Sequence, residues 1–232
     1  LSLKDALAQS INVPAIKVLY LAGLNDVLRL AKDFGITTLG NADRYGLTLV
    51  LGGGEVTLLE MTSAYGVFAN GGTRVPYDSI LEISTKSGDK IYEVERDSFN
   101  VLKPDVAYQI SDMLSDDAAR APIFGANSHL NIFGRDVAVK TGTTNDYKDA
   151  WIVGYTPSLV IGAWVGADNP RIRFRSTALG QGARTAMPIA GDFLQQANRD
   201  GSLATITHAQ FAPLPHSLER EIDCDLFRED GN

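Results

Sequence analysis

The sequence predicts a protein of the α+β class, and three observations lead to that prediction. Residues 1 to about 72 read mainly as helices, because apolar residues recur there at helical spacing. Three short apolar runs then follow one another as strands, over 136–143, 150–156 and 159–166. A further helical pattern over 187–197 comes after the strands. Helices and a group of consecutive strands therefore share one chain.

The N-terminal helices have recognisable ends. Positions 24–34 carry apolar residues on one helical face, and Gly35 is a suitable C-terminal stop. A second helix is expected over 55–69, ending at Asn70-Gly71-Gly72. The three glycines at 52–54 follow no strand and precede no Gly-Lys-Ser/Thr, so they predict a tight helix entry and not a phosphate loop.

The middle and the end of the chain are less regular. Residues 80–94 read as a hairpin around the turn Gly88-Asp89, and 104–114 as a helix with Pro104 in its first turn. Residues 115–131 are polar and irregular, which indicates a loop or a short helix, so that 101–131 is mainly helical. From 201 to 232 the chain is polar and contains prolines, as expected of a tail or a linker.

Length and charge exclude several functions. A chain of 232 residues with 44% hydrophobic and 21% charged residues can form one globular domain or slightly more. Its net charge of −7 argues against a nucleic-acid partner. No apolar stretch approaches the ~20 residues that span a bilayer. The lone Cys224 excludes an internal disulfide, and the three histidines are too far apart for a metal site, so neither a metal nor a cofactor is predicted.

The most informative motif is Lys140-Thr141-Gly142-Thr143-Thr144, which lies between two predicted strands. On an edge strand it places a cation, a hydroxyl and a closely approachable backbone on one wall of a cleft, because glycine has no side chain to block the approach. Lys-Thr-Gly is one of three signatures of β-lactamases and penicillin-binding proteins, beside Ser-x-x-Lys and a Ser-x-Asn-type triplet. Its weight depends on those partners. Trp151 and Trp164, on the next strands, are expected to pack and not to bind ligands.

A Ser-x-Asn triplet occurs at Ser10-Ile11-Asn12, after the predicted helix 3–9 and before Val13-Pro14. Proline disfavours helical geometry in the residue before it, so a helix-to-loop turn is expected, with both polar side chains available to a cleft. Ordinary helix capping by these residues is the alternative. A second triplet, Ser98-Phe99-Asn100, reads as a plain loop before the next helix.

Only one Ser-x-x-Lys occurs in the 232 residues, at Ser87-Gly88-Asp89-Lys90. The motif needs both side chains on one helix face so that the amine can take the hydroxyl proton. Gly88-Asp89 is typical of a hairpin turn, and apolar strand-like residues flank it. This pair is therefore not expected to be catalytic, and the sequence shows no other nucleophile motif.

Taken together, these stretches resemble the transpeptidase domain of class A penicillin-binding proteins. The likeness covers roughly residues 1–200 and is carried by 8–15, by 51–57 with its continuation to Gly72, and above all by 140–157. In that family the Ser-x-x-Lys nucleophile lies several tens of residues before Ser-x-Asn, whereas nine residues precede Ser10 here. The expectation is a C-terminal part of a longer protein, that is, a partial transpeptidase domain. A natural protein without the nucleophile is the alternative.

The resemblance implies a penicillin-binding or serine β-lactamase-like fold: a helical cluster against an antiparallel sheet, with the Lys-Thr-Gly strand at the sheet edge facing the helices. The family's sheet has five strands, of which two flank the nucleophile helix. The fold would therefore be incomplete in this fragment, with three strands and an open apolar edge at 159–166. Such an edge invites association.

The same resemblance implies roles for six residues. Ser10 and Asn12 would join a hydrogen-bond relay to the leaving amine, and Lys140 would hold positive potential in the cleft. Thr141 and Thr143 would bind a carboxylate through their hydroxyls. The Thr143 N–H would be one donor of the oxyanion hole, and Gly142, which has no side chain, would let the substrate come close to this backbone.

The implied function is a peptidoglycan D,D-transpeptidase, a serine acyltransferase that β-lactams inhibit, inactive as this fragment alone. Its partners would be D-Ala-D-Ala stem peptides, β-lactam antibiotics and the missing N-terminal part of the same protein. The location would be extracytoplasmic (the periplasm or the outer face of the inner membrane), with an anchor in that missing part. Two alternatives remain open: a D,D-carboxypeptidase or β-lactamase-like hydrolase, and a non-catalytic domain that binds stem peptide or β-lactam.

Overall fold

The computed structural model describes residues 1–126, 136–144, 148–167, 169, 184–199 and 210–211. Cys224, the three histidines and nearly all of the 201–232 segment lie outside these residues. The helices are α1 (Leu3–Ala8), α2 (Asn12–Ala22), α3 (Leu24–Asp33), α4 (Leu58–Ala69), α5 (Pro104–Ser115), α6 (Asp117–Phe124) and α7 (Ala186–Arg199), with short 3₁₀ turns η1 (Ala42–Arg44) and η2 (Leu47–Leu51). The strands are β1 (Thr73–Arg74), β2 (Glu82–Ser84), β3 (Lys90–Glu93), β4 (Phe99–Asn100), β5 (Ala138–Thr143), β6 (Ala150–Thr156) and β7 (Leu159–Val165).

The main sheet is antiparallel and has the order β5-β6-β7 among the described strands. Its register pairs Gly142 with Trp151 and Trp151 with Trp164, so these three residues form one row across the sheet. Lys140 lies on the same face, because alternate residues of a strand point the same way. The β5 strand is an edge strand of the described sheet, as the resemblance implies.

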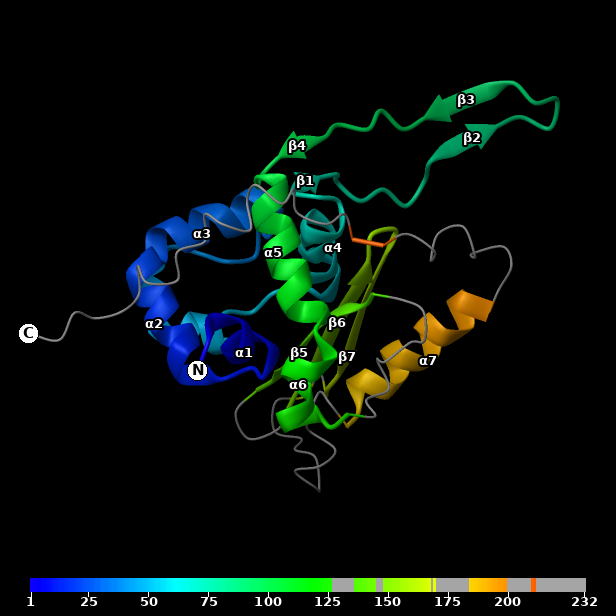
Figure 1. The fold of residues 1–232 in the computed structure, drawn as a ribbon. Helices are drawn as coiled ribbons and strands as arrows, with labels where there is room; N and C mark the ends of the chain where they lie inside the picture. The colour runs from blue at the N-terminus through cyan, green and yellow to red at the C-terminus, as the bar shows by residue number, and fades with distance from the viewer. Residues whose placement is uncertain (127–135, 145–147, 168, 170–183, 200–209, 212–232) are drawn as a thin grey trace, which may run out of the picture.

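Helices cover both faces of this sheet (Figure 1). On one face α7 packs through Met187 and Leu194 against buried strand residues that include Ile152. On the other face, α4 and α5 enclose Tyr155, whose ring contacts those of Tyr65 and Phe68 on α4. The sheet is therefore a layer between two helical layers, and the Lys-Thr-Gly strand is fixed from both sides. The chain has the predicted α+β architecture.

Of two irregular segments, one agrees with the sequence analysis and one differs. Residues 115–131, expected to form a loop or a short helix, include the eight-residue helix α6, and residues 127–131 lie outside the described part of the chain. The triplet Ser98-Phe99-Asn100, predicted as a plain loop, was assigned wrongly, because Phe99 and Asn100 form β4 and pair with β1. A two-residue strand depends on a partner that is distant in sequence, so local pattern does not reveal it.

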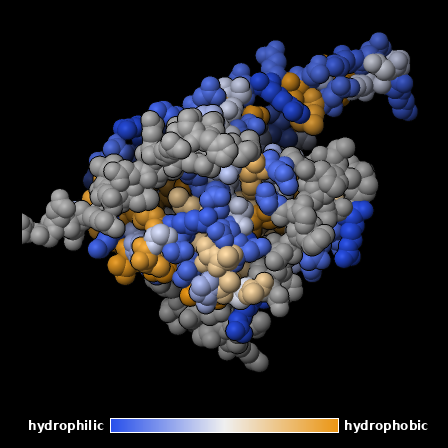
Figure 2. All heavy atoms as spheres, in the orientation of Figure 1, coloured by the Kyte–Doolittle hydropathy of each residue, from blue (hydrophilic) through white to orange (hydrophobic). Residues whose placement is uncertain are grey.

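The β2–β3 hairpin extends away from the body of the molecule and is largely hydrophilic (Figures 1 and 2). Within it, Ser87 donates to Asp89 at 2.7 Å, while Lys90 forms ion pairs with Glu93 at 2.7 Å and Glu82 at 3.5 Å. The lysine is thus engaged by carboxylates and does not activate the serine. This geometry agrees with the expectation that the only Ser-x-x-Lys of the sequence is not catalytic.

Apolar side chains are exposed on α2, where orange spheres gather in Figure 2. Tyr20 is 72% exposed and Leu21 is 68% exposed, and Leu19 is the only residue of α2 that is buried. A helix that is apolar all round is normally buried. Both outer edges of the three-stranded sheet are also unpaired among the described strands. Among the described residues, no helix is long and apolar enough to cross a bilayer.

The 232-residue chain produced by itself is therefore expected to self-associate, as the open edge at 159–166 also predicts. Light scattering after gel filtration measures this directly. Replacing Tyr20 by glutamine together with Leu21 by lysine should raise the monomer fraction. Leu19→Lys is the matched control: this residue is 3% exposed, so the substitution should unfold the chain and not improve its solubility. A monomeric wild-type chain with a sharp cooperative melt would contradict the prediction.

Candidate active site

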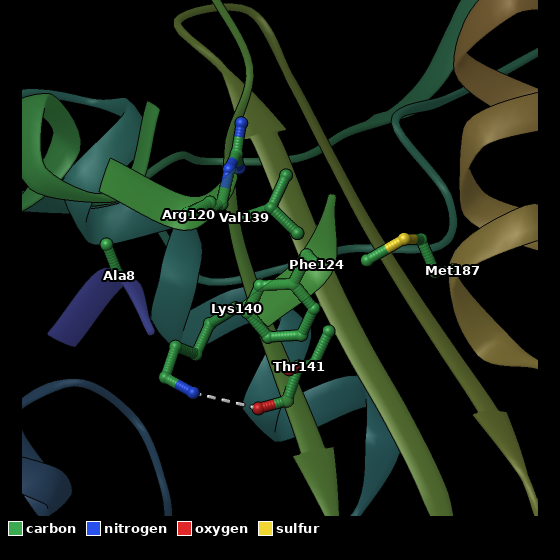
Figure 3. A pocket seen from close by; sticks show the side chains of 7 residues that line it. All are labelled: Ala8, Arg120, Phe124, Val139, Lys140, Thr141 and Met187. Atoms are coloured by element: carbon green, nitrogen blue, oxygen red, sulfur yellow. Dashed lines mark hydrogen bonds between the residues drawn. The ribbon is translucent and has the colours of Figure 1, made fainter. Parts of the chain in front are cut away.

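Lys140 and Ser10 meet in the structure although 130 positions separate them in sequence. The Lys140 side chain leaves β5 toward the turn between α1 and α2, where its Nζ donates to Ser10 Oγ at 2.6 Å. The same Nζ donates to the Thr141 carbonyl at 2.9 Å (Figure 3). The structure thus brings together the Lys-Thr-Gly and Ser-x-Asn motifs, which the sequence analysis could identify only separately.

Ser10 holds an unfavourable backbone conformation. Its φ of 58° places it in the left-handed region, and no other non-glycine residue of the described chain has positive φ. The Ile11 N–H donates to the Ala6 carbonyl at 2.9 Å, and the Ser10 N–H donates to the Leu7 carbonyl at 3.1 Å. This is the Schellman pattern that ends many helices, and glycine is its usual residue at the position of Ser10. A serine there is strained, as often seen at functional sites.

Asn12 follows this turn as the first residue of α2, with its side chain exposed. The sequence analysis placed this stretch in a helix-to-loop turn, and the loop part is wrong because a new helix starts at once. Pro14 is compatible with that helix, since it lies in the first turn, where backbone N–H groups have no partner within the helix. The outcome is a tight elbow between two helices, which presents Ser10 toward β5.

Burial of the Lys140 amine lowers its pKa to about 8. None of the ion pairs of the described residues involves this lysine, so no carboxylate there offsets the cost of desolvating the charge. The amine is therefore mostly protonated at neutral pH, and roughly a tenth of it is neutral at pH 7. It can attract an anion and also exchange a proton near physiological pH.

A small pocket lies beside this pair (Figure 3). It is lined by Ala8, Arg120, Phe124, Val139, Lys140, Thr141 and Met187. Its cavity of about 10 Å³ holds at most one water molecule. The pocket is therefore a packed floor under the site, and the exposed end of β5 at Thr143 lies outside it.

Arg120 is a component of this floor that the sequence analysis did not identify. It is 5% exposed, its Nη1 donates to the Leu114 carbonyl at 2.9 Å, and its Nη2 pairs with Asp117. Its Nε has no hydrogen-bond partner among the described residues. Figure 3 shows the guanidinium pointing away from Lys140. Arg120 thus fixes the junction of α5 and α6 and does not face the Lys140 amine.

Lys4 anchors the helix that ends at Ser10. Its Nζ lies 2.8 Å from an Asp116 carboxylate oxygen and 3.1 Å from one of Asp112, so α1 is tied to the end of α5 and the start of α6. The hydrogen bond to Asp116 is the main reason that the pKa of Lys4 is raised, and the same contact lowers the pKa of Asp116. The pairs are partly exposed, so each contributes little to stability. Their main effect is to fix α1 relative to α6.

Gly142 allows a close approach within the sheet. A Cβ at this position would lie 3.1 Å from the Cβ of Trp151, its cross-strand neighbour. A side chain at position 142 would therefore push β5 away from β6 or displace the tryptophan. Thr141, Gly142 and Thr143 follow Lys140 directly on β5, in continuous register with β6. All six residues singled out in the sequence thus lie on β5 or on the α1–α2 elbow.

Comparison with known proteins agrees with this geometry. A family model described as the penicillin binding protein transpeptidase domain matches residues 1–187. Penicillin-binding protein 1A of Aquifex aeolicus is 38% identical over 200 residues, covering 85% of this chain and 26% of the relative. Penicillin-binding protein 1A of Rickettsia felis is 31% identical over 222 residues, covering 86% of this chain and 27% of the relative.

Solved structures show the same fold. Penicillin-binding protein 1A from Haemophilus influenzae superposes with a TM-score of 0.73 at 26% identity, covering 87% of this chain and 35% of that one. The PonA1 protein from Mycobacterium tuberculosis in complex with penicillin V gives a TM-score of 0.72 at 26% identity, covering 92% and 60%. The chain spans about a quarter of the length of the curated relatives quoted above. With the family model matching most of its length, the chain belongs to the penicillin-binding protein transpeptidase domain family.

Proposed function

We propose that this chain forms one wall of the active site of a serine-type peptidoglycan D,D-transpeptidase that β-lactams acylate. The hydrogen bond from Lys140 to Ser10 is the observation that carries the proposal, because it assembles two of the three signatures of such enzymes. Family membership supports the same reaction class. The similar PonA1 structure was solved with penicillin V.

The reaction is an acyl transfer in two steps. A serine oxygen attacks the carbonyl carbon between the two D-alanines, and the terminal D-alanine leaves with a proton on its amine. The amine of a second stem peptide then attacks the ester and forms the cross-linking amide; it loses one of its own protons, and the serine oxygen takes up a proton as the ester bond breaks. Ser10 and Lys140 are suited to relay these protons, since they already share a short hydrogen bond and the lysine has a pKa of about 8. Asn12, at the start of α2, would orient the peptide amide.

The C-terminal end of β5 would bind the substrate. The hydroxyls of Thr141 and Thr143 would bind the terminal carboxylate of the stem peptide or of a β-lactam. The Thr143 N–H would donate to the developing oxyanion, and in a serine protease one such donor contributes about 3–4 kcal/mol. Gly142 lets β5 lie close to Trp151 of β6, since a Cβ there would lie 3.1 Å from the Trp151 Cβ.

The nucleophile would come from another part of the same polypeptide. The 232 residues contain one Ser-x-x-Lys, on the distal hairpin, where Lys90 is paired with glutamates. The proposed partners of this chain are therefore the remainder of its own domain, D-Ala-D-Ala stem peptides and β-lactams. The proposed location is the outer face of the bacterial inner membrane, with an anchor outside this sequence.

Fluorescent penicillin and the full-length protein that contains this chain provide the test. With fluorescent penicillin, the expected result is a covalent adduct detected by intact-protein mass spectrometry. With a stem peptide and an acceptor amine, the expected result is release of D-alanine and formation of an amide between the two. Hydrolysis with water as the only acceptor would indicate a carboxypeptidase or β-lactamase. Reversible binding without an adduct would leave a binding domain. Ser87→Ala is the control and should leave acylation unchanged.

A further inference from the structure

The end of β5 is closed by a dense set of contacts between Thr144 and Asp149. The Thr144 N–H donates to the Asp149 carbonyl at 3.2 Å, and the Asp149 N–H donates to Thr144 Oγ1 at 2.9 Å. The Thr144 hydroxyl in turn donates to Asp149 Oδ2 at 2.9 Å. Three hydrogen bonds thus join these two residues, where β5 leaves the ladder and β6 enters it.

The same carboxylate also reaches the far strand of the sheet. Its Oδ1 accepts from Trp164 Nε1 at 3.0 Å, so Asp149 connects the loop after β5 to β7. The Trp164 ring packs against that of Trp151, with centroids 6.4 Å apart, and Trp151 in turn abuts Gly142. Asp149 thus links Thr144 to Trp164, Trp164 packs on Trp151, and Trp151 lies against Gly142 of β5. The tryptophans pack, as predicted, and one of them also serves as a hydrogen-bond donor.

Glycine at position 166 makes room for this arrangement. A Cβ there would lie 2.3 Å from Trp164 Cζ2 and 2.8 Å from Asp149 Oδ1. Neither distance is tolerable for a real side chain, so any other residue at this position would displace the tryptophan or the carboxylate. Gly166→Ala therefore perturbs the contact without removing either of its hydrogen-bonding groups.

We propose that Asp149 is a positioning residue, which holds the C-terminal end of β5 in the geometry that acyl transfer requires. The inference rests on the proposed function, in which the Thr143 N–H donates to the oxyanion. Asp149 would hold this N–H in place through its hydrogen bonds to the next residue, Thr144. Misplacing a catalytic group by about 1 Å can cost on the order of 100-fold in rate. The Thr144 contacts and the Trp164 contact fix this end of the strand from two directions.

A structural role alone would lower stability and leave the chemistry of the folded enzyme unchanged. The distal hairpin offers a matched control, because Asp89 closes it in the same way: Thr85 N–H donates to the Asp89 carbonyl at 2.8 Å, and the Asp89 N–H donates to Thr85 Oγ1 at 3.0 Å. Asp89→Ala removes an equivalent turn carboxylate far from β5. It should leave acylation at the wild-type rate.

The experiment measures pre-steady-state acylation of the full-length protein by fluorescent penicillin, normalised to the folded fraction, so that the first-order acylation constant and the non-covalent Kd are separated. Asp149→Ala should lower the acylation constant at least tenfold, with Kd within about threefold of wild type. Asp149→Asn should restore part of the rate, since the amide oxygen can still accept one hydrogen bond. Trp164→Phe and Gly166→Ala should give intermediate losses.

An acylation constant within twofold of wild type for folded Asp149→Ala would overturn the proposal, as would a lower melting temperature with unchanged rate. If Asp149→Ala does not fold, Trp164→Phe and Gly166→Ala decide, and wild-type rates in both would refute it. If the proposed function itself is wrong, the wild-type protein will form no adduct with penicillin. That result differs from a normal acylation rate in Asp149→Ala, which would overturn only the role of Asp149.

Discussion

Replacing Ser10 by glycine is expected to abolish acyl transfer and, at the same time, to give a fold that is more stable than that of Ser10→Ala. Ser10 occupies the left-handed position of a Schellman turn, where a residue with a Cβ costs roughly 1–2 kcal/mol. Glycine removes this strain but has more freedom in the unfolded chain, which offsets roughly 0.5–1 kcal/mol. Relative to Ser10→Ala, which loses the same hydrogen bond from Lys140, a net gain of roughly 0.5–1 kcal/mol should remain, visible as a higher denaturation midpoint.

The loss of activity has a separate cause. The hydroxyl that accepts from Lys140 at 2.6 Å disappears, and positioned proton transfer of this kind contributes about 10²–10⁴-fold to a rate. Acylation of the full-length protein by fluorescent penicillin measures this loss. Ser10→Ala is the matched control: it loses the same hydroxyl but keeps the Cβ, so activity should fall equally while stability does not rise. Near wild-type acylation in Ser10→Gly would show that the Ser-x-Asn serine is not part of the mechanism.

Ser10 and Lys140 could be identified from the sequence because each stands in a short local motif beside a predicted helix or strand. Residue type and neighbouring residues are sufficient for that identification. The 2.6 Å contact between Ser10 and Lys140 could not be predicted from sequence alone, because it depends on how α1 packs beside β5. The helix that begins at Asn12 was missed for a local reason: Pro14 suggests a break, yet proline is well tolerated in a first helical turn.

Other features of the site are invisible to pattern reasoning because they are set by tertiary contacts. Helix α6 is short and contains Pro122, so its apolar periodicity is weak, although its residues Arg120 and Phe124 line the floor of the site. Asp149 belongs to the stretch 140–157 that carries the family resemblance, but the sequence assigns it no role. Its bond to Trp164 spans 15 positions and exists only because β6 and β7 pair in this register. The strands themselves were predictable, since three apolar runs with turns between them allow few alternatives.

Acylation by penicillin is expected to fall as pH rises through about 8. Burial lowers the pKa of Lys140 to about 8, so the amine is a cation below that pH and neutral above it. Only the cation attracts the penicillin carboxylate, which stays ionised throughout. The second-order acylation constant of the full-length protein, measured from about pH 6.5 to about pH 9.5 so that the range brackets this pKa, should therefore decline on the alkaline side.

Two comparisons assign that decline to Lys140. In Lys140→Arg the guanidinium stays charged over the whole range, so the alkaline decline should vanish even where the rate is lower at every pH. A penicillin ester, which lacks the carboxylate, should react with wild type more slowly and without the decline. If Lys140 instead acted as the neutral base that deprotonates the nucleophile, the constant would rise through pH 8. The direction of the profile thus distinguishes electrostatic binding of the carboxylate from proton abstraction by the same side chain.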